Sequence, residues 1–170
     1  MTGRALVVGY GNPLRGDDGV GQALAAALAK TATGTLDVIG CHQLTPELAE
    51  RLATVDLVIF VDADIEGQPG SIRVTKIRQS TTQHGSSLVH HVNPAALLLL
   101  SRQIYGRSPE AFIVTVAAGS FALSEGLSEP VAAALPEVVA TIRRLVREHL
   151  RTGADQLRTE SSSAPPASTN

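Results

Sequence analysis

Acidic and imidazole side chains recur in this sequence directly after segments that are typical of buried strands. The pair Asp17 and Asp18 follows the first apolar segment, Asp62 ends a run of apolar residues, and His90 and His91 close a long polar stretch. A carboxylate at the end of a buried strand loses hydration and needs a partner, and a metal ion is one such partner. Carboxylates combined with an imidazole suit zinc or nickel without singling out one metal. The pattern therefore predicts a divalent-metal site assembled from these segments.

The same residues also have structural interpretations that need no metal. An aspartate before a helix can cap its free N–H groups and stabilise it by about 1 kcal/mol. Two aspartates in a row leave the second carboxylate free to face a crevice, so we expect Asp17 or Asp18 to cap and the other to be available for function. Asp64 is expected to be a turn residue that accepts a hydrogen bond from its own backbone.

Alternating strand-like and helix-like segments must position these side chains. Strands are predicted at residues 4–9, 36–41, 56–61, 71–77 and 112–116, the fourth of them an edge strand. Helices are predicted at residues 18–30, 46–53, 93–105 and 130–151. This order predicts a three-layer α/β fold, in which a mainly parallel, twisted sheet of about five strands carries helices on both faces. In such sheets, ligands bind beyond the carboxyl ends of the strands, where the acidic residues lie.

Composition limits the domain organisation and the kinds of partner. Residues 1–152 are expected to form one α/β domain, and residues 153–170, rich in Ser, Ala, Pro and Thr, to form a disordered tail. The net charge of −2 without a basic block argues against nucleic-acid binding. No apolar run approaches the roughly 20 residues of a membrane span. A single cysteine, Cys41, and a first segment without signal-peptide features predict a cytoplasmic protein.

Other templates for binding and catalysis fit less well. Gly9 and Gly11 match the start of a dinucleotide-binding fingerprint, but Leu14 occupies the third glycine position and Pro13 removes a backbone donor. The sequence has no zinc-protease helix and no nucleophile-elbow serine. Cys41 is expected to be a small buried residue rather than a nucleophile.

The segment VVGYGNPLRGDDGVG, residues 7–21, resembles the signature of the hydrogenase maturation proteases. The matching features are a Gly-x-Gly-Asn-Pro turn, an acidic pair and a Gly-Val-Gly element. The likeness continues at the third strand with Asp62 and at His90 before a leucine-rich helix, and it spans roughly residues 4–150 in the same order.

This resemblance implies a set of site residues. The family's metal ligands are two acidic side chains and one histidine, which correspond to Asp18, Asp62 and His90, with His91 as the alternate ligand. Asp18 or Asp62 is also the expected general base.

The expected substrate-binding residues are Asn12, Asp17, His42 and Gln43. The family often carries an Asp-Gly-Gly-Thr-like turn after the second strand. This sequence has CHQLTP there, at residues 41–46, which indicates a divergent subgroup with its own substrate specificity.

The implied activity is metal-dependent removal of the C-terminal extension from a [NiFe] hydrogenase large-subunit precursor after nickel insertion. The nickel would be carried by the precursor, and other divalent metals could occupy the same ligands. The precursor is then the protein partner, and neither nucleic acid nor membrane is involved. The alternative is a metal-binding peptidase or maturation factor of the same fold with a different protein client.

Overall fold

The computed structural model describes residues 3–78 and 92–161, with side chains up to Arg151. Its centre is one five-stranded sheet with the order β2-β1-β3-β5-β4. The strands are β1 (Ala5–Tyr10), β2 (Leu36–Cys41), β3 (Leu57–Asp64), β4 (Ile72–Lys76) and β5 (Glu110–Ala117). Neighbouring strands are parallel except for β4, which pairs antiparallel with β5 at the edge of the sheet. The predicted parallel sheet and its edge strand are both confirmed.

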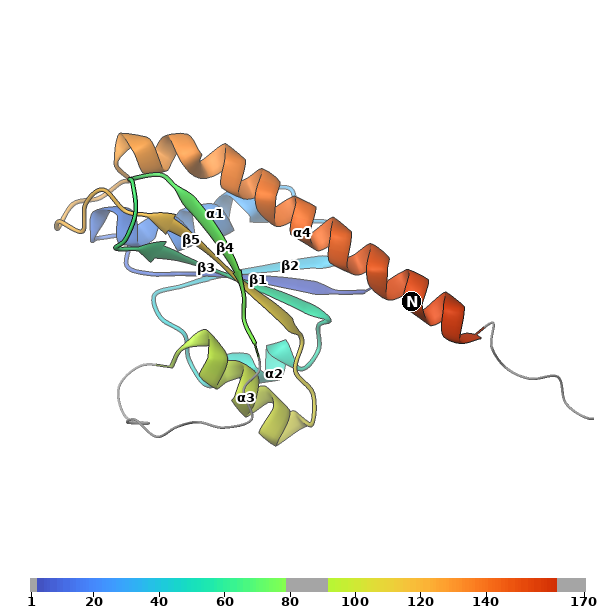
Figure 1. Ribbon diagram of the computed structural model, residues 1–170. Coiled ribbons are helices and arrows are strands. Elements are labelled where there is room, and N and C mark those ends of the chain that lie inside the picture. Colours follow the sequence, from blue (N-terminus) through green and yellow to red (C-terminus); the bar gives the residue numbers. More distant parts are fainter. Residues whose placement is uncertain (1–2, 79–91, 162–170) are drawn as a thin grey trace, which may run out of the picture.

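Helices cover both faces of this sheet, so the predicted three-layer α/β fold is also confirmed (Figure 1). The helices are α1 (Val20–Ala29), α2 (Leu48–Leu52), α3 (Pro94–Tyr105) and α4 (Glu129–Ser161), and a short 3₁₀ helix, η1 (Gly16–Gly19), precedes α1. Helices α1 and α4 lie on one face, and α2 and α3 lie on the other. Within the described residues, none of these helices has the length and apolar character needed to cross a membrane.

Alternating side chains of the central strands supply the two cores. Val7 and Ile59 are buried under α1 and α4, whereas Val8 and Phe60 are buried under α2 and α3. Strands buried on both faces in this way have near-continuous apolar sequences. The core therefore fixes β1 and β3 side by side at the centre of the sheet, and their carboxyl ends share one edge.

Several predicted helix boundaries differ from the structure: α2, predicted at residues 46–53, spans Leu48–Leu52, and α1 and α4 differ as well. Helix α1 begins at Val20 rather than at Asp18, because residues 16–19 form the 3₁₀ turn η1 and Gly19 holds the N-cap position. Neither Asp17 nor Asp18 caps α1, since no side chain makes a hydrogen bond at that cap. Both carboxylates are consequently available for other bonds.

Helix α4 continues beyond the predicted end at Arg151 and reaches Ser161, within the range predicted for the tail. The segment after Arg151 contains alanine, leucine, glutamine and arginine, which are strong helix formers, and the one glycine there costs only about 1 kcal/mol. The predicted disorder of residues 162–170 falls outside the described residues.

Candidate functional site

The carboxyl ends of β1 and β3 meet at the point where the chain changes from one face of the sheet to the other. The chain leaves β1 through α1 on one face and enters β3 through α2 on the opposite face. A crevice at such a switch point is the usual ligand site of an open parallel sheet. The segment after β1 contributes Asp18 to this point, and the C-terminal part of β3 contributes Asp62.

Glycines allow the chain to return tightly over the end of β1. A Cβ atom at Gly9 would lie 1.9 Å from the carbonyl oxygen of Gly21, and one at Gly21 would lie 2.4 Å from the carbonyl oxygen of Tyr10. The start of α1 therefore packs directly on the backbone of β1. Gly11 has φ 134°, a conformation that favours glycine. The spacing of the Gly-x-Gly and Gly-Val-Gly elements thus has a steric cause, and its result is to hold Asp18 above the strand end.

Hydrogen bonds fix the position of Asp18. The backbone N–H of Asn12 donates to Asp18 Oδ2 at 2.9 Å, and Gln22 Nε2 donates to the carbonyl oxygen of Gly11 at 2.7 Å. The side-chain oxygen of Asn12 accepts from the N–H of Leu14 at 3.0 Å, which closes the turn. Among the described residues, Asp18 Oδ1 has no hydrogen-bond partner.

Asp62 is partly buried and lies close to two other carboxylates. Burial raises the pKa of Asp62, and repulsion from Asp18 and Asp64 raises it further, against the lowering effect of hydrogen bonds from the Tyr10 hydroxyl and the Ala63 N–H. Burial, followed by the charge of Asp62, likewise raises the pKa of Tyr10, so the phenol stays protonated and donates. The pair Asp18 and Asp62 therefore concentrates negative charge that a cation would neutralise.

Asp17 has a different environment from its neighbour. It is fully buried, and its carboxylate accepts four hydrogen bonds. The donors are the N–H groups of Gly119 (2.7 Å), Ser120 (3.0 Å) and Ser128 (2.7 Å) and the hydroxyl of Ser128 (2.8 Å). We call this arrangement the Asp17 clasp. It joins the loop after β1 to the loop after β5 and gives Asp17 a structural role, while its predicted substrate-binding role stays a prediction.

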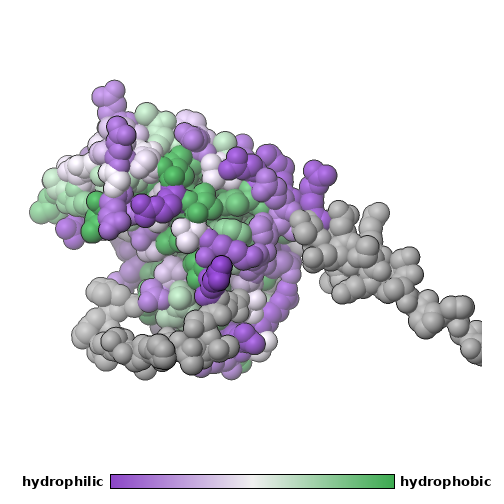
Figure 2. Space-filling model, viewed as in Figure 1, coloured by the Kyte–Doolittle hydropathy of each residue, from purple (hydrophilic) through white to green (hydrophobic). Residues whose placement is uncertain are grey.

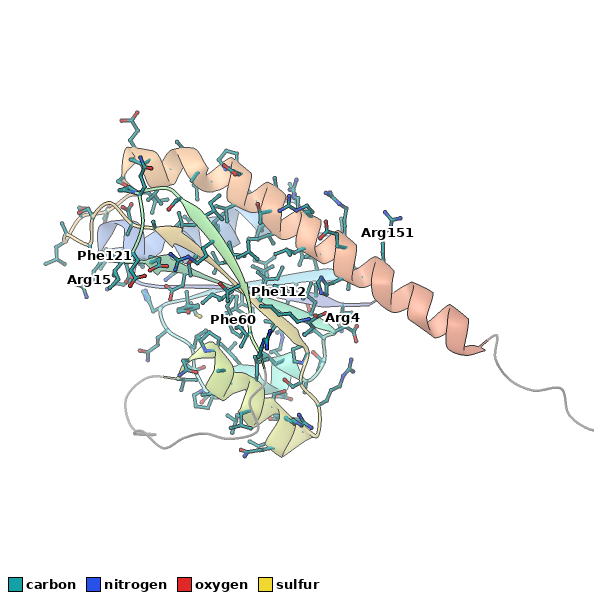
Figure 3. All side chains as sticks on the ribbon, viewed as in Figure 1. Arg4, Arg15, Phe60, Phe112, Phe121 and Arg151 are labelled. Atoms are coloured by element: carbon teal, nitrogen blue, oxygen red, sulfur yellow. The ribbon has the colours of Figure 1, made fainter. Side chains whose placement is uncertain are left out.

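The two joined loops also pair through their backbones. Arg15 and Ser124 form an isolated parallel bridge, and the N–H of Gly16 donates to the carbonyl oxygen of Ser124 at 2.9 Å. Figure 3 labels Arg15 and Phe121, one from each loop, at this end of the molecule. The wall of the site on this side is thus a doubly connected pair of loops.

The remaining predicted residues after the strands have varied surroundings. Asp64 accepts from the N–H of Glu66 at 3.0 Å, as predicted for a turn residue, and pairs with Arg73 at 3.2 Å. His42 and Gln43 are exposed after β2. The thiol of Cys41 is only partly buried, so the prediction of a buried cysteine is wrong. Cys41 lies at the carboxyl end of β2, the strand at the edge of the sheet next to β1.

Several solved structures share this architecture. The hydrogenase maturating endopeptidase HybD from E. coli superposes with a TM-score of 0.69 at 23% identity, over 85% of this chain and 93% of its own. The [NiFe] hydrogenase maturation protease HycI from Thermococcus kodakarensis gives 0.69 at 22% identity, over 86% and 94%. A hydrogenase 2 maturation peptidase from a Thaumarchaeota archaeon gives 0.64 at 26% identity, over 84% and 97%. No protein-family model and no curated protein sequence matches the chain.

The chain has the fold of the hydrogenase maturation proteases. The resemblance inferred from residues 7–21 is therefore confirmed. The shared fold covers residues on both sides of the β1–β3 crevice, because more than four-fifths of this chain is matched in each of the three comparisons.

The structure of this chain brings together two of the three predicted metal ligands, Asp18 and Asp62. Asp18 and Asp62 are close enough for the charge of one to raise the pKa of the other. His90 and His91 lie outside the described residues, so the imidazole ligand stays a prediction. Among the residues that the structure describes, no three His, Cys, Asp or Glu side chains form a metal-binding group. The described part of the candidate site is thus a pair of neighbouring carboxylates.

Sequence reasoning missed two residues of the site. Tyr10 donates to Asp62, and Gln22 ties the first turn of α1 to Gly11. A signal for Tyr10 was present, because a large aromatic residue between the two glycines of a Gly-x-Gly turn must point away from the helix that packs on those glycines. Nothing in the sequence around Gln22 distinguishes it from a surface residue of an Ala-rich helix.

Proposed function

We propose that this protein is a metal-dependent endopeptidase that removes the C-terminal extension of a [NiFe] hydrogenase large-subunit precursor after nickel insertion. The observation that carries this proposal is the pair Asp18 and Asp62 at the β1–β3 switch point of a fold shared with hydrogenase maturation proteases. The nickel in this scheme belongs to the precursor and is part of the substrate.

The two carboxylates have complementary roles in the proposed reaction. Asp18 holds one oxygen in the turn and presents the other, which suits a fixed metal ligand. Asp62 has a raised pKa and a neighbouring phenol donor, which suits a group that exchanges a proton. Peptide hydrolysis needs both roles: a water oxygen adds to the scissile carbonyl carbon as its proton passes to a base, and the C–N bond breaks as that proton reaches the leaving nitrogen. We assign the proton transfer to Asp62.

Exposed apolar side chains around the carboxylates favour a protein substrate. Leu14, Ile65 and Leu123 are exposed by 53%, 81% and 89%, and they follow β1, β3 and β5 respectively. Figure 2 shows hydrophobic side chains gathered at this end of the molecule. Apolar residues next to a polar centre are typical of surfaces that bind other proteins. We call these three residues the apolar rim and propose that it contacts the precursor.

The direct test is a cleavage assay with nickel-loaded and nickel-free large-subunit precursor, followed by mass measurement of the C-terminal region. We expect wild-type protein to cleave only the nickel-loaded precursor, and both Asp18→Asn and Asp62→Asn to fail. Asp37→Asn is the matched control. Asp37 lies on β2, away from the candidate site, and is a partly exposed carboxylate that forms an ion pair with Arg4. Cleavage by the two site variants at the wild-type rate would refute the site assignment.

A second candidate function is that of a peptidase or maturation factor of the same fold with a different client. The observation that favours it is the exposed turn after β2, where His42 and Gln43 occupy the place of the family's Asp-Gly-Gly-Thr-like turn. Divalent-metal binding that depends on Asp62, together with no cleavage of either precursor, would support this function over the first.

A further inference from the structure

A cavity lies at the end of the sheet opposite the candidate site. It has a volume of about 480 Å³ and opens between Gly3, the connection from α1 to β2, and residues 143–151 of α4. Figure 1 shows α4 crossing one face of the sheet and passing close to the N-terminal end of the chain. Cavities of this size are typical of small-molecule sites. The carboxylates of the candidate active site do not line this cavity.

Three arginines of α4 line the cavity: Arg143, Arg147 and Arg151. Their spacing of four residues places them in one row along the helix. All three arginines are exposed. Like charges four residues apart destabilise a helix by about 0.2–0.5 kcal/mol per pair. A bound anion would relieve this repulsion between the three arginines.

The helix macrodipole does not explain this row. Its attraction for cations is confined to the last turn of a helix. Because α4 continues to Ser161, the three arginines lie more than two turns before its end. Arg143 is held in place by donating to the hydroxyl of Thr31, which leaves other guanidinium N–H groups for a ligand.

The rest of the lining is apolar or carries hydroxyl groups. Leu36, Val146 and Leu150 supply apolar surface, and Thr33 and Thr35 line the cavity beside Thr31. Arginine is suited to planar or tetrahedral oxyanions because its fork of N–H groups can form paired hydrogen bonds. A row of arginines beside apolar lining residues thus suits a molecule with an anionic head and an apolar body.

We infer that this cavity, the arginine pocket, binds a small amphipathic anion whose phosphate or carboxylate head contacts Arg147 and Arg151 and whose apolar body contacts Leu36 and Leu150. The inference is independent of the proposed protease function, because it concerns the opposite end of the sheet. It assigns the protein a ligand site in addition to the Asp18–Asp62 pair.

The test is calorimetric titration of the full-length protein with hexyl phosphate, hexanoate and inorganic phosphate at matched ionic strength. We expect saturable binding of hexyl phosphate or hexanoate, and the tighter of the two identifies the preferred head group. The apolar body should make that probe bind at least about tenfold more tightly than inorganic phosphate. Equal binding of hexyl phosphate and inorganic phosphate, with no binding of hexanoate, would overturn the apolar part of the inference.

Two double variants distinguish binding in the arginine pocket from a general effect of the protein's positive charges. Arg147→Gln with Arg151→Gln should weaken binding by about tenfold or more, because both charged hydrogen-bond donors are lost. Arg102→Gln with Arg144→Gln removes the same charge from exposed positions outside the cavity and should change affinity by less than about twofold. Circular dichroism establishes that each variant is folded. Equal binding by the two double variants, or no saturable binding of any probe at millimolar concentration, would overturn the inference.

Discussion

The Asp17 clasp and the Asp18–Asp62 pair lie at the same edge of the sheet, but their carboxylates have opposite surroundings. Asp17 is fully buried, and burial alone would raise its pKa; the bonds from Ser128, Gly119 and Ser120 outweigh that effect and hold the pKa below its usual value. Asp62 is partly open to solvent, faces two other carboxylates and has a raised pKa.

This difference separates stability from function within one short segment of chain. A carboxylate with all its acceptor positions filled contributes to folding and has nothing left for a ligand. A carboxylate held close to others of the same charge costs folding free energy, and that cost is recovered when a cation binds. Asp17 and Asp18 are adjacent in sequence, yet the first belongs to the clasp and the second to the site.

The largest expected effect is on cleavage by Asp62→Asn. Loss of the proton-transfer group should lower the cleavage rate by about 100-fold to 10,000-fold. The free energy of unfolding at pH 7 should stay equal or rise by up to about 1 kcal/mol, because repulsion from Asp18 and Asp64 is removed. The measurements are the precursor-cleavage rate and urea denaturation. A variant that unfolds much more easily than wild type would show that Asp62 belongs with the clasp.

Variants of the Asp17 clasp should show the reverse: the free energy of unfolding falls while cleavage is unchanged. Asp17→Ala leaves three buried N–H groups and one hydroxyl without their acceptor, so we expect a loss of about 3 kcal/mol or more in unfolding free energy. Ser128→Ala removes only the hydroxyl donor and should cost about 1 kcal/mol. Urea denaturation measures both. Cleavage per folded molecule should be unchanged, and a large loss of cleavage in the stable Ser128→Ala variant would contradict the separation.

The two carboxylates should also affect stability in opposite directions as pH changes. The lowered pKa of Asp17 gives stability that is present above its unfolded pKa, about 3.9, and is lost as pH falls through the folded pKa. The raised pKa of Asp62 gives a cost that develops as pH rises from the unfolded pKa through the folded pKa. Urea denaturation from about pH 3 to pH 8 should therefore show the deficit of Asp17→Asn, and any gain of Asp62→Asn, growing towards neutral pH. A deficit of Asp17→Asn that grows in acid would contradict this assignment.

The layers of the fold were predictable because apolar strands and capped helices leave local signals. Helix α3 begins with Asn93 accepting from the N–H of Ala96 at 2.8 Å and with Pro94 at its first position, and it ends before Gly106 with φ 70°, which agrees with the predicted range 93–105. Asp62 was predictable as a site residue, since a carboxylate directly after five apolar strand residues has few structural uses.

The partners of the aspartate pair were not predictable from local sequence. The clasp donors lie more than 100 positions after Asp17, and no periodicity links Gly119 or Ser128 to it. Local reasoning therefore predicted a helix cap for this pair, which is the commonest use of aspartate before a helix. Tertiary contacts with the loop after β5 decide which of Asp17 and Asp18 is free.

The smallest expected effect is on Asp64, the third carboxylate at this edge. Asp64 forms an ion pair with Arg73, whose side chain is 58% exposed, and exposed ion pairs contribute about 0.2–1 kcal/mol to the free energy of unfolding. Asp64→Asn keeps an oxygen that can accept from the N–H of Glu66, so unfolding free energy should fall by no more than that amount. The same change removes one charge that raises the pKa of Asp62. The acid limb of the cleavage–pH profile should therefore move to lower pH, while the maximal rate stays close to wild type. A large fall in the maximal rate would mean that Asp64 acts with Asp18 and Asp62, and that the reacting group is a carboxylate triad rather than a pair.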